Sequence, residues 1–210
     1  MKNIDWQLYV ITDASVSMGR SHSETAALAL EGGAGVIQLR DKELSAGRLV
    51  EEGEKILTLT REKDALFIVN DRLDAAMALE ADGIHLGQED LPLPLARRIA
   101  GPEMIIGATV RNLEQARLAQ EAGADYLGVG AVFPSSAKAT APVIGLNNLR
   151  EVKKAVSIPV VAIGGITLDN LFQVIEAGAD GAAVVSAVVG AQDITAQARK
   201  FKLIWHDLQR

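Results

Sequence analysis

The chain contains EAGADYLGV at residues 121–129 and a near copy, EAGADGAAV, at residues 176–184. Looser versions are EGGAGVIQL at residues 31–39 and LEADGIHL at residues 79–86. Each copy reads as the end of a helix, a turn of small residues and an apolar strand. Glycine at a helix C-terminus adopts the left-handed conformation without steric cost, so the repeat predicts one type of joint, from helix to strand. The spacing of the copies varies, which argues against a solenoid of identical units.

Outward from these joints, the chain contains unbroken apolar runs such as LFIV and VVAI, which are typical of parallel strands buried on both faces. The predicted strands cover residues 8–12, 35–39, 66–69, 83–86, 104–108, 125–129, 159–163 and 181–185. Amphipathic stretches between them predict helices over residues 22–32, 45–62, 71–80, 91–100, 112–122, 146–156, 168–177 and 193–209. Ser45 and Asn112 are predicted N-caps, and Thr167 is expected to open its helix.

Strands that alternate with helices predict a parallel sheet, and eight strands are the number that closes a barrel. With 210 residues, each βα unit has about 26 residues, near the lower size limit of a (β/α)8 barrel. The length leaves no room for a second domain, so residues 1–210 are expected to form one. A doubly wound open sheet is the alternative, but TDASVSMGR at residues 12–20 lacks the GxGxxG turn that usually follows its first strand. We therefore predict an α/β fold, a single-domain TIM barrel.

Composition excludes several classes of protein. The 21 Lys and Arg against 27 Asp and Glu give a net charge of −6, which disfavours nucleic acid as a partner. The absence of cysteine excludes disulfides, cysteine-ligated metals and a thiol nucleophile, and the 3 histidines are too scattered for a histidine metal cage. No apolar run approaches the roughly 20 residues that span a bilayer, and no secretory signal is recognisable. We therefore expect a cytoplasmic protein without a membrane partner.

In a barrel of this kind, the chemistry lies at the carboxyl ends of the strands. The second strand runs into QLRDK, and because side chains alternate along a strand, Gln38, Arg40 and Lys42 point the same way. Lys138 adds a cation after the sixth strand. Polar side chains at the end of a buried strand need partners, and a pyrophosphate would supply them, with bidentate contacts from arginine. The alternative is a salt-bridge cluster with the aspartates of the same rim, which are Asp13, Asp71 and Asp90.

Two aspartates would stand on adjacent strand ends, Asp71 after the third strand and Asp90 after the fourth. Mg²⁺ is commonly held by one or two carboxylates together with water and substrate phosphates, so the pair is a candidate magnesium site. The alternative is that each aspartate caps the helix that follows it, since aspartate is a favoured N-cap. The spacing of the two residues leaves both interpretations open.

A second candidate anion site follows the seventh and eighth strands, at Gly164, Gly165, Val185 and Ser186. In many barrels these two loops bind phosphate through backbone N–H groups, and glycine lets the backbone approach the anion closely. Two anion sites on one rim fit two small phosphorylated substrates better than one. The inferred reaction is a substitution that expels pyrophosphate, with the metal and the cations stabilising the leaving group.

Seven motifs taken together resemble the thiamine-phosphate synthase family from about residue 8 to residue 190. They are YVITD, QLRDK, VNDR, ADGIHLGQED, GADYLGVGAVFP, IPVVAIGGI and GADGAAVVSAV. The resemblance implies a TIM barrel that joins hydroxymethylpyrimidine diphosphate to hydroxyethylthiazole phosphate, forming thiamine phosphate and releasing pyrophosphate. It also implies Mg²⁺ as cofactor, reaction through a pyrimidine cation and a homodimer.

The resemblance assigns roles to individual residues. The pyrimidine diphosphate would contact Gln38, Leu39, Arg40, Asp41, Lys42, Asn70, Thr109 and Lys138. Among these, the catalytic cations would be Arg40, Lys42 and Lys138. The thiazole phosphate would contact Ser135, Ser136, Ala137, Gly165, Val185 and Ser186. The magnesium ligands would be Asp71 and Asp90. Two positions depart from the family pattern, since Thr109 replaces the usual serine and Ala137 stands where the family usually has a hydroxyl.

Two other functions remain as alternatives. One is an isomerase similar to the thiazole tautomerases, which share the barrel, and the other is a thiamine-phosphate-binding paralogue without catalysis. The joint presence of QLRDK, NDR and GQED favours the synthase. The histidines carry no assigned chemistry. His85 is expected to be buried and hydrogen-bonded within its strand, whereas His22 and His206 are expected on exposed helical stretches.

Overall fold

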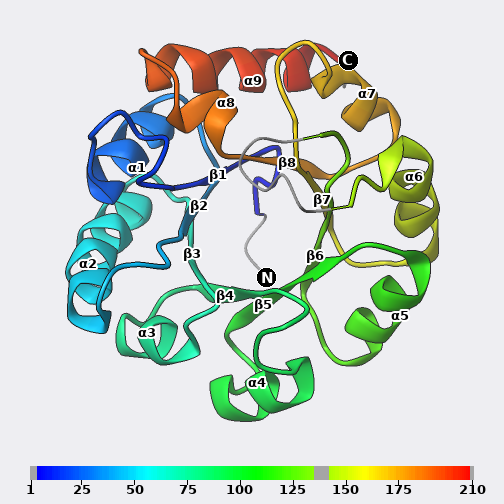
Figure 1. Ribbon diagram of the computed structural model, residues 1–210, viewed down its shortest axis with the longest axis horizontal. Coiled ribbons are helices and arrows are strands. Elements are labelled where there is room, and N and C mark those ends of the chain that lie inside the picture. The colour runs from blue at the N-terminus through cyan, green and yellow to red at the C-terminus, as the bar shows by residue number, and fades with distance from the viewer. Residues whose placement is uncertain (1–3, 135–141, 209–210) are drawn as a thin grey trace.

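The computed structural model describes residues 4–134 and 142–208, and within them eight parallel strands close into a barrel. Each strand pairs with the next in chain order, and β1 pairs with β8 to complete the circle (Figure 1). The strands are β1 Leu8–Ile11, β2 Val36–Leu39, β3 Leu66–Asn70, β4 Gly83–Leu86, β5 Ile105–Val110, β6 Tyr126–Gly130, β7 Val160–Ile163 and β8 Gly181–Val184. The predicted (β/α)8 TIM barrel is confirmed.

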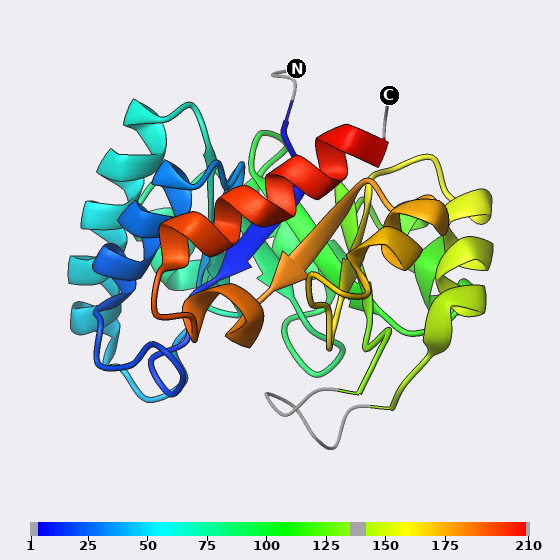
Figure 2. The same ribbon diagram turned by 90° about the horizontal axis from the view of Figure 1, so that it is seen from above.

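Helices surround this barrel as an outer ring, which explains why the strands are apolar on both faces (Figure 1). They are α1 His22–Glu31, α2 Ala46–Glu62, α3 Leu73–Ala78, α4 Leu93–Ala100, α5 Leu113–Glu121, α6 Gly145–Ala155, α7 Leu171–Glu176, α8 Ser186–Val189 and α9 Ile194–Leu208. Seen from the side, the strands all run toward one face of the molecule (Figure 2). Over the described residues, no helix combines the length and the apolar character that crossing a bilayer demands.

The structure confirms two of the predicted N-caps and departs from the prediction at α7 and α8. The side chains of Ser45 and Asn112 cap α2 and α5 as predicted. Thr167 does not open α7, because its backbone N–H donates to the side chain of Asn170 in a turn and the helix begins at Leu171. The sequence prediction missed α8, because a helix of 4 residues is too short to show a helical period.

The repeated helix-to-strand joint is held by its aspartate. In three joints, the aspartate just before a strand accepts a hydrogen bond from a backbone N–H of the preceding strand. The pairs are Asp82 with Phe67 at 2.8 Å, Asp125 with Ile106 at 2.7 Å and Asp180 with Val160 at 2.7 Å. A cation on a neighbouring helix adds an ion pair of 2.5 Å in two of them, Arg97 to Asp125 and Lys153 to Asp180. The repeat therefore encodes the amino-terminal rim of the barrel as well as the turn.

We expect Asp125→Ala to lower the free energy of unfolding by about 1–2 kcal/mol, because it leaves the backbone N–H of Ile106 and the guanidinium of Arg97 without their shared acceptor. Urea denaturation measures the change. Asp125→Asn is the matched control, since it retains an oxygen that can accept from Ile106, and it is expected to lose less. Equal stability of Asp125→Ala and the wild type would contradict this account of the joint.

Aromatic side chains fill the amino-terminal end of the barrel interior. Trp6 packs against Tyr126 with ring centroids 4.6 Å apart and the planes tilted, and the Tyr9 ring lies 6.0 Å from that of Tyr126. All three are buried, with Ile68 and Val161 packed among them. This aromatic plug closes the amino-terminal end of the barrel, so that open space is left at the carboxyl ends of the strands.

Candidate active site

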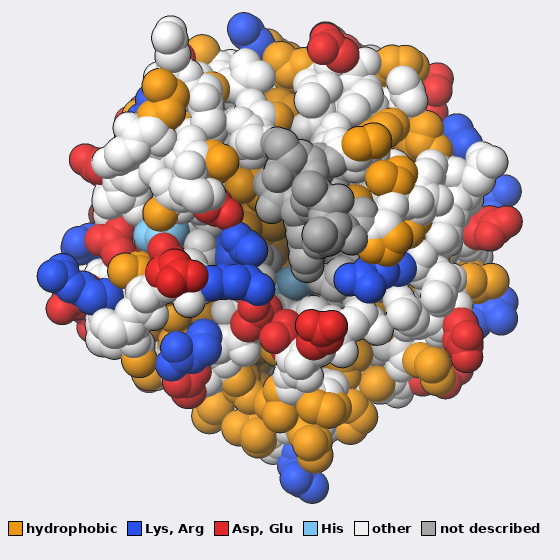
Figure 3. All heavy atoms as spheres, in the orientation of Figure 1, with side chains coloured by type: hydrophobic (Ala, Val, Ile, Leu, Met, Phe, Trp, Pro, Cys, Tyr) orange, Lys and Arg blue, Asp and Glu red, His pale blue; other side chains and the backbone are white. Residues whose placement is uncertain are grey.

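A pocket of about 620 Å³ opens at the carboxyl ends of the strands, above the aromatic plug. Figure 3 looks onto this face and shows acidic and basic side chains gathered around its centre. Ten of the residues assigned from the sequence line the pocket, namely Gln38, Arg40, Lys42, Asn70, Asp71, Asp90, Thr109, Gly165, Val185 and Ser186. Four others, Ser135, Ser136, Ala137 and Lys138, lie outside the described residues. Leu39 and Asp41 do not line the pocket.

Alternation of side chains along β2 and the residues that follow it explains the placement of Leu39 and Asp41. Gln38, Arg40 and Lys42 face the pocket as predicted, so the residues between them face the helices. Leu39 is fully buried in the layer between barrel and helices. Asp41 forms an ion pair with His22, Oδ2 to Nε2, at 2.9 Å. Direct contact of either side chain with a substrate in this pocket does not fit these positions.

The expected exposure of His22 is wrong. Its side chain is 6 % exposed, because both ring nitrogens find partners beneath the rim, Asp41 on one side and Thr12 on the other. Its helical position predicted exposure to solvent, but α1 turns the His22 side chain toward the ends of β1 and β2. His206 on α9 is exposed as expected.

The cationic wall of the pocket consists of Arg40 and Lys42, which follow directly after β2. Nη1 of Arg40 lies 2.7 Å from Oδ2 of Asp13, and the Arg40 side chain keeps 29 % exposure. Asp13 is itself held by the backbone N–H of Ser15 at 3.0 Å. One of the ion pairs that the salt-bridge alternative predicts is therefore present, between Arg40 and Asp13. Because this ion pair also orients the Arg40 guanidinium, it is compatible with a role of Arg40 in binding an anion.

Asp71 and Asp90 form a carboxylate pair on the rims of β3 and β4. Burial and a hydrogen bond to Asp90 raise the pKa of Asp71 to about 6, while Lys42 opposes the rise. Asp90 also accepts from the backbone N–H of Gly87 at 2.6 Å. Neither aspartate caps a helix, because the N-cap residues of α3 and α4 are Arg72 and Pro92. The capping alternative is therefore excluded for both.

The donor chemistry of this pair fits a hard divalent cation. Two half-buried carboxylates that repel each other gain from a cation between them. Within residues 4–134 and 142–208, no group of three or more His, Asp or Glu side chains converges. Two protein oxygens leave coordination positions for water and substrate phosphate, which is how Mg²⁺ is commonly bound.

The raised pKa of Asp71 predicts a pH-dependent stability of the metal-free protein. Asp71 binds its proton more tightly in the folded state, so the stability that this proton contributes is present below about pH 4 and is lost as the pH rises through about 6. At pH 7.5 with EDTA, we expect Asp71→Asn to raise the melting temperature by about 2–4 °C, with the two proteins converging near pH 4.

Asp74→Asn is the control for this measurement. Arg72 holds the pKa of Asp74 at about 2, so neutralising Asp74 removes a favourable contact and is expected to give no gain in melting temperature. A melting temperature of Asp71→Asn at or below that of the wild type at pH 7.5 would show that the carboxylate pair is not strained.

A buried hydrogen-bonded chain forms the floor of the pocket, and the site residues assigned from the sequence did not include most of it. Nε2 of Gln38 donates to the hydroxyl of Tyr9 at 2.6 Å, and this hydroxyl lies 2.8 Å from the hydroxyl of Tyr126. That hydroxyl lies 2.9 Å from Nδ1 of His85, and Nε2 of His85 lies 2.8 Å from Oγ1 of Thr109. The chain fixes the amide of Gln38 and the hydroxyl of Thr109 at the base of the pocket.

His85 is buried and hydrogen-bonded, as expected from the sequence. Burial lowers its pKa to about 4, so the imidazole is neutral at pH 7. A neutral imidazole donates through one nitrogen and accepts through the other, which matches its two hydroxyl neighbours. Its place in the network is therefore that of a relay between Tyr126 and Thr109.

A glycine loop forms the wall of the pocket across the barrel from β3. Gly165 follows β7 with a φ of 65°, and a Cβ there would collide with the carbonyl oxygen of Pro134, so only glycine fits. Asn170 donates to the carbonyl of Gly165 at 2.9 Å and holds the loop. Together with Val185 and Ser186, this loop presents backbone rather than charge to the pocket.

A cationic wall, a carboxylate pair and a backbone-lined wall around one pocket define a class: a (β/α)8-barrel protein with a site suited to phosphorylated small molecules. The model of the family described as "Thiamine monophosphate synthase" matches residues 8–188. The chain belongs to this family, and the resemblance stated from the motifs is confirmed.

Individual relatives span nearly the whole chain. It is 53% identical to the thiamine-phosphate synthase of Moorella thermoacetica over 198 residues, 94% of each chain. It is also 53% identical to that of Pyrococcus abyssi over 188 residues, covering 90% of this chain and 89% of the relative. Among solved structures, the thiamine phosphate pyrophosphorylase of Pyrococcus furiosus superposes with a TM-score of 0.92 at 46% identity, covering 99% of this chain and 98% of that one.

Proposed function

We propose that the protein is a thiamine-phosphate synthase, a transferase that joins hydroxymethylpyrimidine diphosphate to hydroxyethylthiazole phosphate and releases pyrophosphate. The observation that carries the proposal is the meeting of Gln38, Arg40, Lys42, Asp71 and Asp90 around one pocket. Membership of the family and the names of its relatives support it.

The diphosphate end of the first substrate would lie against the cationic wall. Arg40 offers a planar pair of donors and Lys42 a point charge, which together suit the two phosphates. Asp71 and Asp90 would hold Mg²⁺, which supplies positive charge to the leaving pyrophosphate when it is bound. Lys138 would add a third cation, although it lies outside the described residues. The floor would face the pyrimidine, with the fixed amide of Gln38 and the Thr109 hydroxyl as hydrogen-bonding groups.

The reaction requires no general base. The bond between the pyrimidine methylene carbon and the diphosphate oxygen breaks, and its electron pair leaves with the pyrophosphate. The thiazole nitrogen then supplies the electron pair for the new C–N bond to the resulting pyrimidine cation. No proton moves between these atoms, so the protein must stabilise charge rather than transfer protons. A neutral, buried His85 fits this requirement, because it places no positive charge beneath the cation.

The second substrate would bind on the opposite wall. Its phosphate would meet the backbone at Gly165, Val185 and Ser186, with Ser135, Ser136 and Ala137 contributing from outside the described residues. We further propose a homodimer in the cytoplasm that binds these small phosphorylated substrates and has no nucleic-acid or membrane partner.

The test is a coupled assay of pyrophosphate release with both substrates, with Mg²⁺ or with EDTA. Release that needs both substrates and Mg²⁺, with thiamine phosphate identified by mass spectrometry, is expected. Isomerisation of the thiazole phosphate alone would identify an isomerase. Binding of thiamine phosphate without turnover would identify a non-catalytic binding protein, and either result would overturn the proposal.

A further inference from the structure

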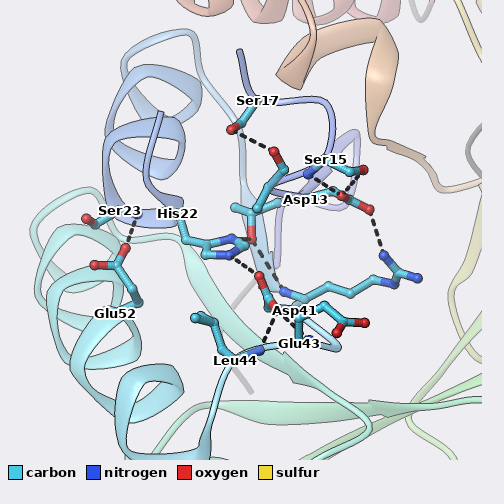
Figure 4. Close-up of polar contacts among 12 residues, drawn as sticks. Asp13, Ser15, Ser17, His22, Ser23, Asp41, Glu43, Leu44 and Glu52 are labelled. Atoms are coloured by element: carbon cyan, nitrogen blue, oxygen red, sulfur yellow. Dashed lines mark hydrogen bonds and ion pairs between the residues drawn. The ribbon is translucent and has the colours of Figure 1, made fainter. Parts of the chain in front are cut away.

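A buried cluster of three polar side chains, Thr12, His22 and Asp41, lies directly behind the cationic wall. The side chain of His22 on α1 is 6 % exposed and that of Asp41 after β2 is 10 % exposed. Nε2 of His22 lies 2.9 Å from Oδ2 of Asp41, and Nδ1 lies 2.8 Å from Oγ1 of Thr12. Figure 4 shows the imidazole pointing at Asp41 from the first helix. None of these three residues lines the pocket, so none is placed to touch a substrate there.

This group holds both ends of the segment that carries the two cations. On one side, Oγ1 of Thr12 accepts from the backbone N–H of Arg40 at 3.4 Å, and the N–H of Thr12 donates to the carbonyl of Gln38 at 2.9 Å. On the other side, Oδ1 of Asp41 accepts from the backbone N–H groups of two following residues, Glu43 at 2.7 Å and Leu44 at 2.8 Å. His22 joins the two sides through a single ring.

The ionisation of Asp41 supports a stable contact. Burial alone would raise the pKa of Asp41, but hydrogen bonds from His22 and from the backbone N–H groups of Glu43 and Leu44 hold it below its usual range. The carboxylate is therefore charged at neutral pH and keeps all three bonds. Removing its partner would leave a buried charge in part unpaired, which is costly.

The connectivity Thr12–His22–Asp41 resembles that of a hydrolytic triad, but its environment excludes nucleophilic catalysis. Thr12 is fully buried. Its hydroxyl also lies 3.3 Å from the carbonyl of Gln38 and within reach of the Arg40 backbone. A nucleophile must meet a substrate carbonyl, and this hydroxyl has no access to one.

We propose that His22 and Asp41 are positioning residues, which fix the backbone between Gln38 and Leu44 so that Arg40 and Lys42 bind a diphosphate in one geometry. The identity of that diphosphate as a substrate rests on the proposed function. Small displacements of preorganised charges are costly for binding and rate. Because Arg40 and Lys42 would contact the diphosphate and not the thiazole phosphate, loss of the His22–Asp41 contact is expected to affect the diphosphate substrate alone.

Two substitutions of one histidine separate its two contacts. In His22→Asn, the amide reaches the position of Nδ1 and keeps the contact with Thr12. In His22→Gln, the amide reaches the position of Nε2 and keeps the contact with Asp41. Because Asp41 anchors the turn that carries Lys42, we expect His22→Asn to weaken binding of inorganic pyrophosphate with Mg²⁺ about tenfold. For His22→Gln, binding is expected to stay within about threefold of the wild type.

The measurements are calorimetric titration with pyrophosphate and Mg²⁺, and steady-state kinetics with each substrate varied. In His22→Asn, the KM for the diphosphate is expected to rise about tenfold while the KM for the thiazole phosphate stays within about twofold. If His22→Asn does not fold, Asp41→Asn serves instead, since it retains an oxygen for the Glu43 and Leu44 N–H groups.

Glu52→Ala is the matched structural control. Glu52 links α2 to α1 by accepting from the backbone N–H of Ser23 at 2.9 Å, without touching the Arg40 segment. It is expected to lower the melting temperature and leave both KM values unchanged. The inference is overturned if His22→Asn binds pyrophosphate as the wild type does, if both KM values rise together, or if Glu52→Ala changes the KM for the diphosphate.

The two proposals fail separately. If the wild type makes no thiamine phosphate yet binds pyrophosphate, the proposed function is wrong and the titrations still judge the positioning role. If the wild type binds no pyrophosphate in the presence of Mg²⁺, the positioning inference is wrong whatever the activity.

Discussion

Replacement of Asp90 by asparagine is expected to slow pyrophosphate release about 1000-fold. Asparagine keeps an oxygen that can accept from the backbone N–H of Gly87, so the loop after β4 is preserved. What is lost is the negative charge that Asp90 places beside Asp71. Without it, Mg²⁺ would bind weakly and the leaving pyrophosphate would lose its countercharge. Asp71→Asn is expected to have a similar effect on the rate.

This result would combine with the stability measurement into one argument. Asp71→Asn should be more stable than the wild type without metal and almost inactive with it, as expected where function maintains like charges side by side. Steady-state rates across a Mg²⁺ series, together with calorimetric titration of Mg²⁺ in the presence of pyrophosphate, provide the readouts. Asp74→Asn, which changes an exposed aspartate on α3, should keep wild-type kinetics. Retention of more than about a third of the activity by Asp90→Asn would exclude the carboxylates as metal ligands.

The barrel was predictable because its joints repeat. In three of the four repeated joints a glycine takes the left-handed conformation where the helix ends, at Gly33, Gly123 and Gly178, whereas Glu80 takes it in the fourth. In three joints an aspartate accepts a hydrogen bond from the neighbouring strand. These are local signals, and strands that alternate with helices form a parallel sheet that eight strands close into a barrel. The rim residues followed from the same logic, since strand direction alone places Arg40, Asp71 and Asp90 on one face.

The residues of the pocket floor were harder to predict from the sequence, because both faces of their strands are buried. In an open sheet, polar residues mark the solvent face, but here Tyr9, His85 and Tyr126 stand among apolar neighbours on strands covered by helices. A usable signal exists nonetheless. Polar residues within β1, β2, β4, β5 and β6 all point to the interior, and they are Tyr9, Gln38, His85, Thr109 and Tyr126. The pair of His22 and Asp41 has no such signal, because nothing local relates residues on separate elements.

The second large effect is expected at Arg40. Arg40→Ala should lower kcat/KM for the diphosphate substrate about 100-fold, because it removes a planar, charged donor from the wall that would hold both phosphates. Arg40→Lys should recover part of this loss, since it restores the charge but not the paired donors. The KM for the thiazole phosphate should change little in either variant, because that substrate would bind at the opposite wall. Arg48→Ala is the control, because Arg48 lies on α2 with its side chain 74 % exposed, and this variant should behave as the wild type.

Asp13→Asn separates this role from the salt-bridge interpretation. If Arg40 served only to pair with Asp13 across 2.7 Å, then Asp13→Asn would cost as much activity as Arg40→Ala. If Arg40 binds the diphosphate, Asp13 only aims the guanidinium, and the asparagine oxygen can still accept its hydrogen bond. The expected loss is then within about fivefold, with the KM for the diphosphate affected alone. Equal losses in both variants, with equal falls in melting temperature, would make Arg40 a structural residue and leave Lys42 and Arg111 as the other described cations that line the pocket.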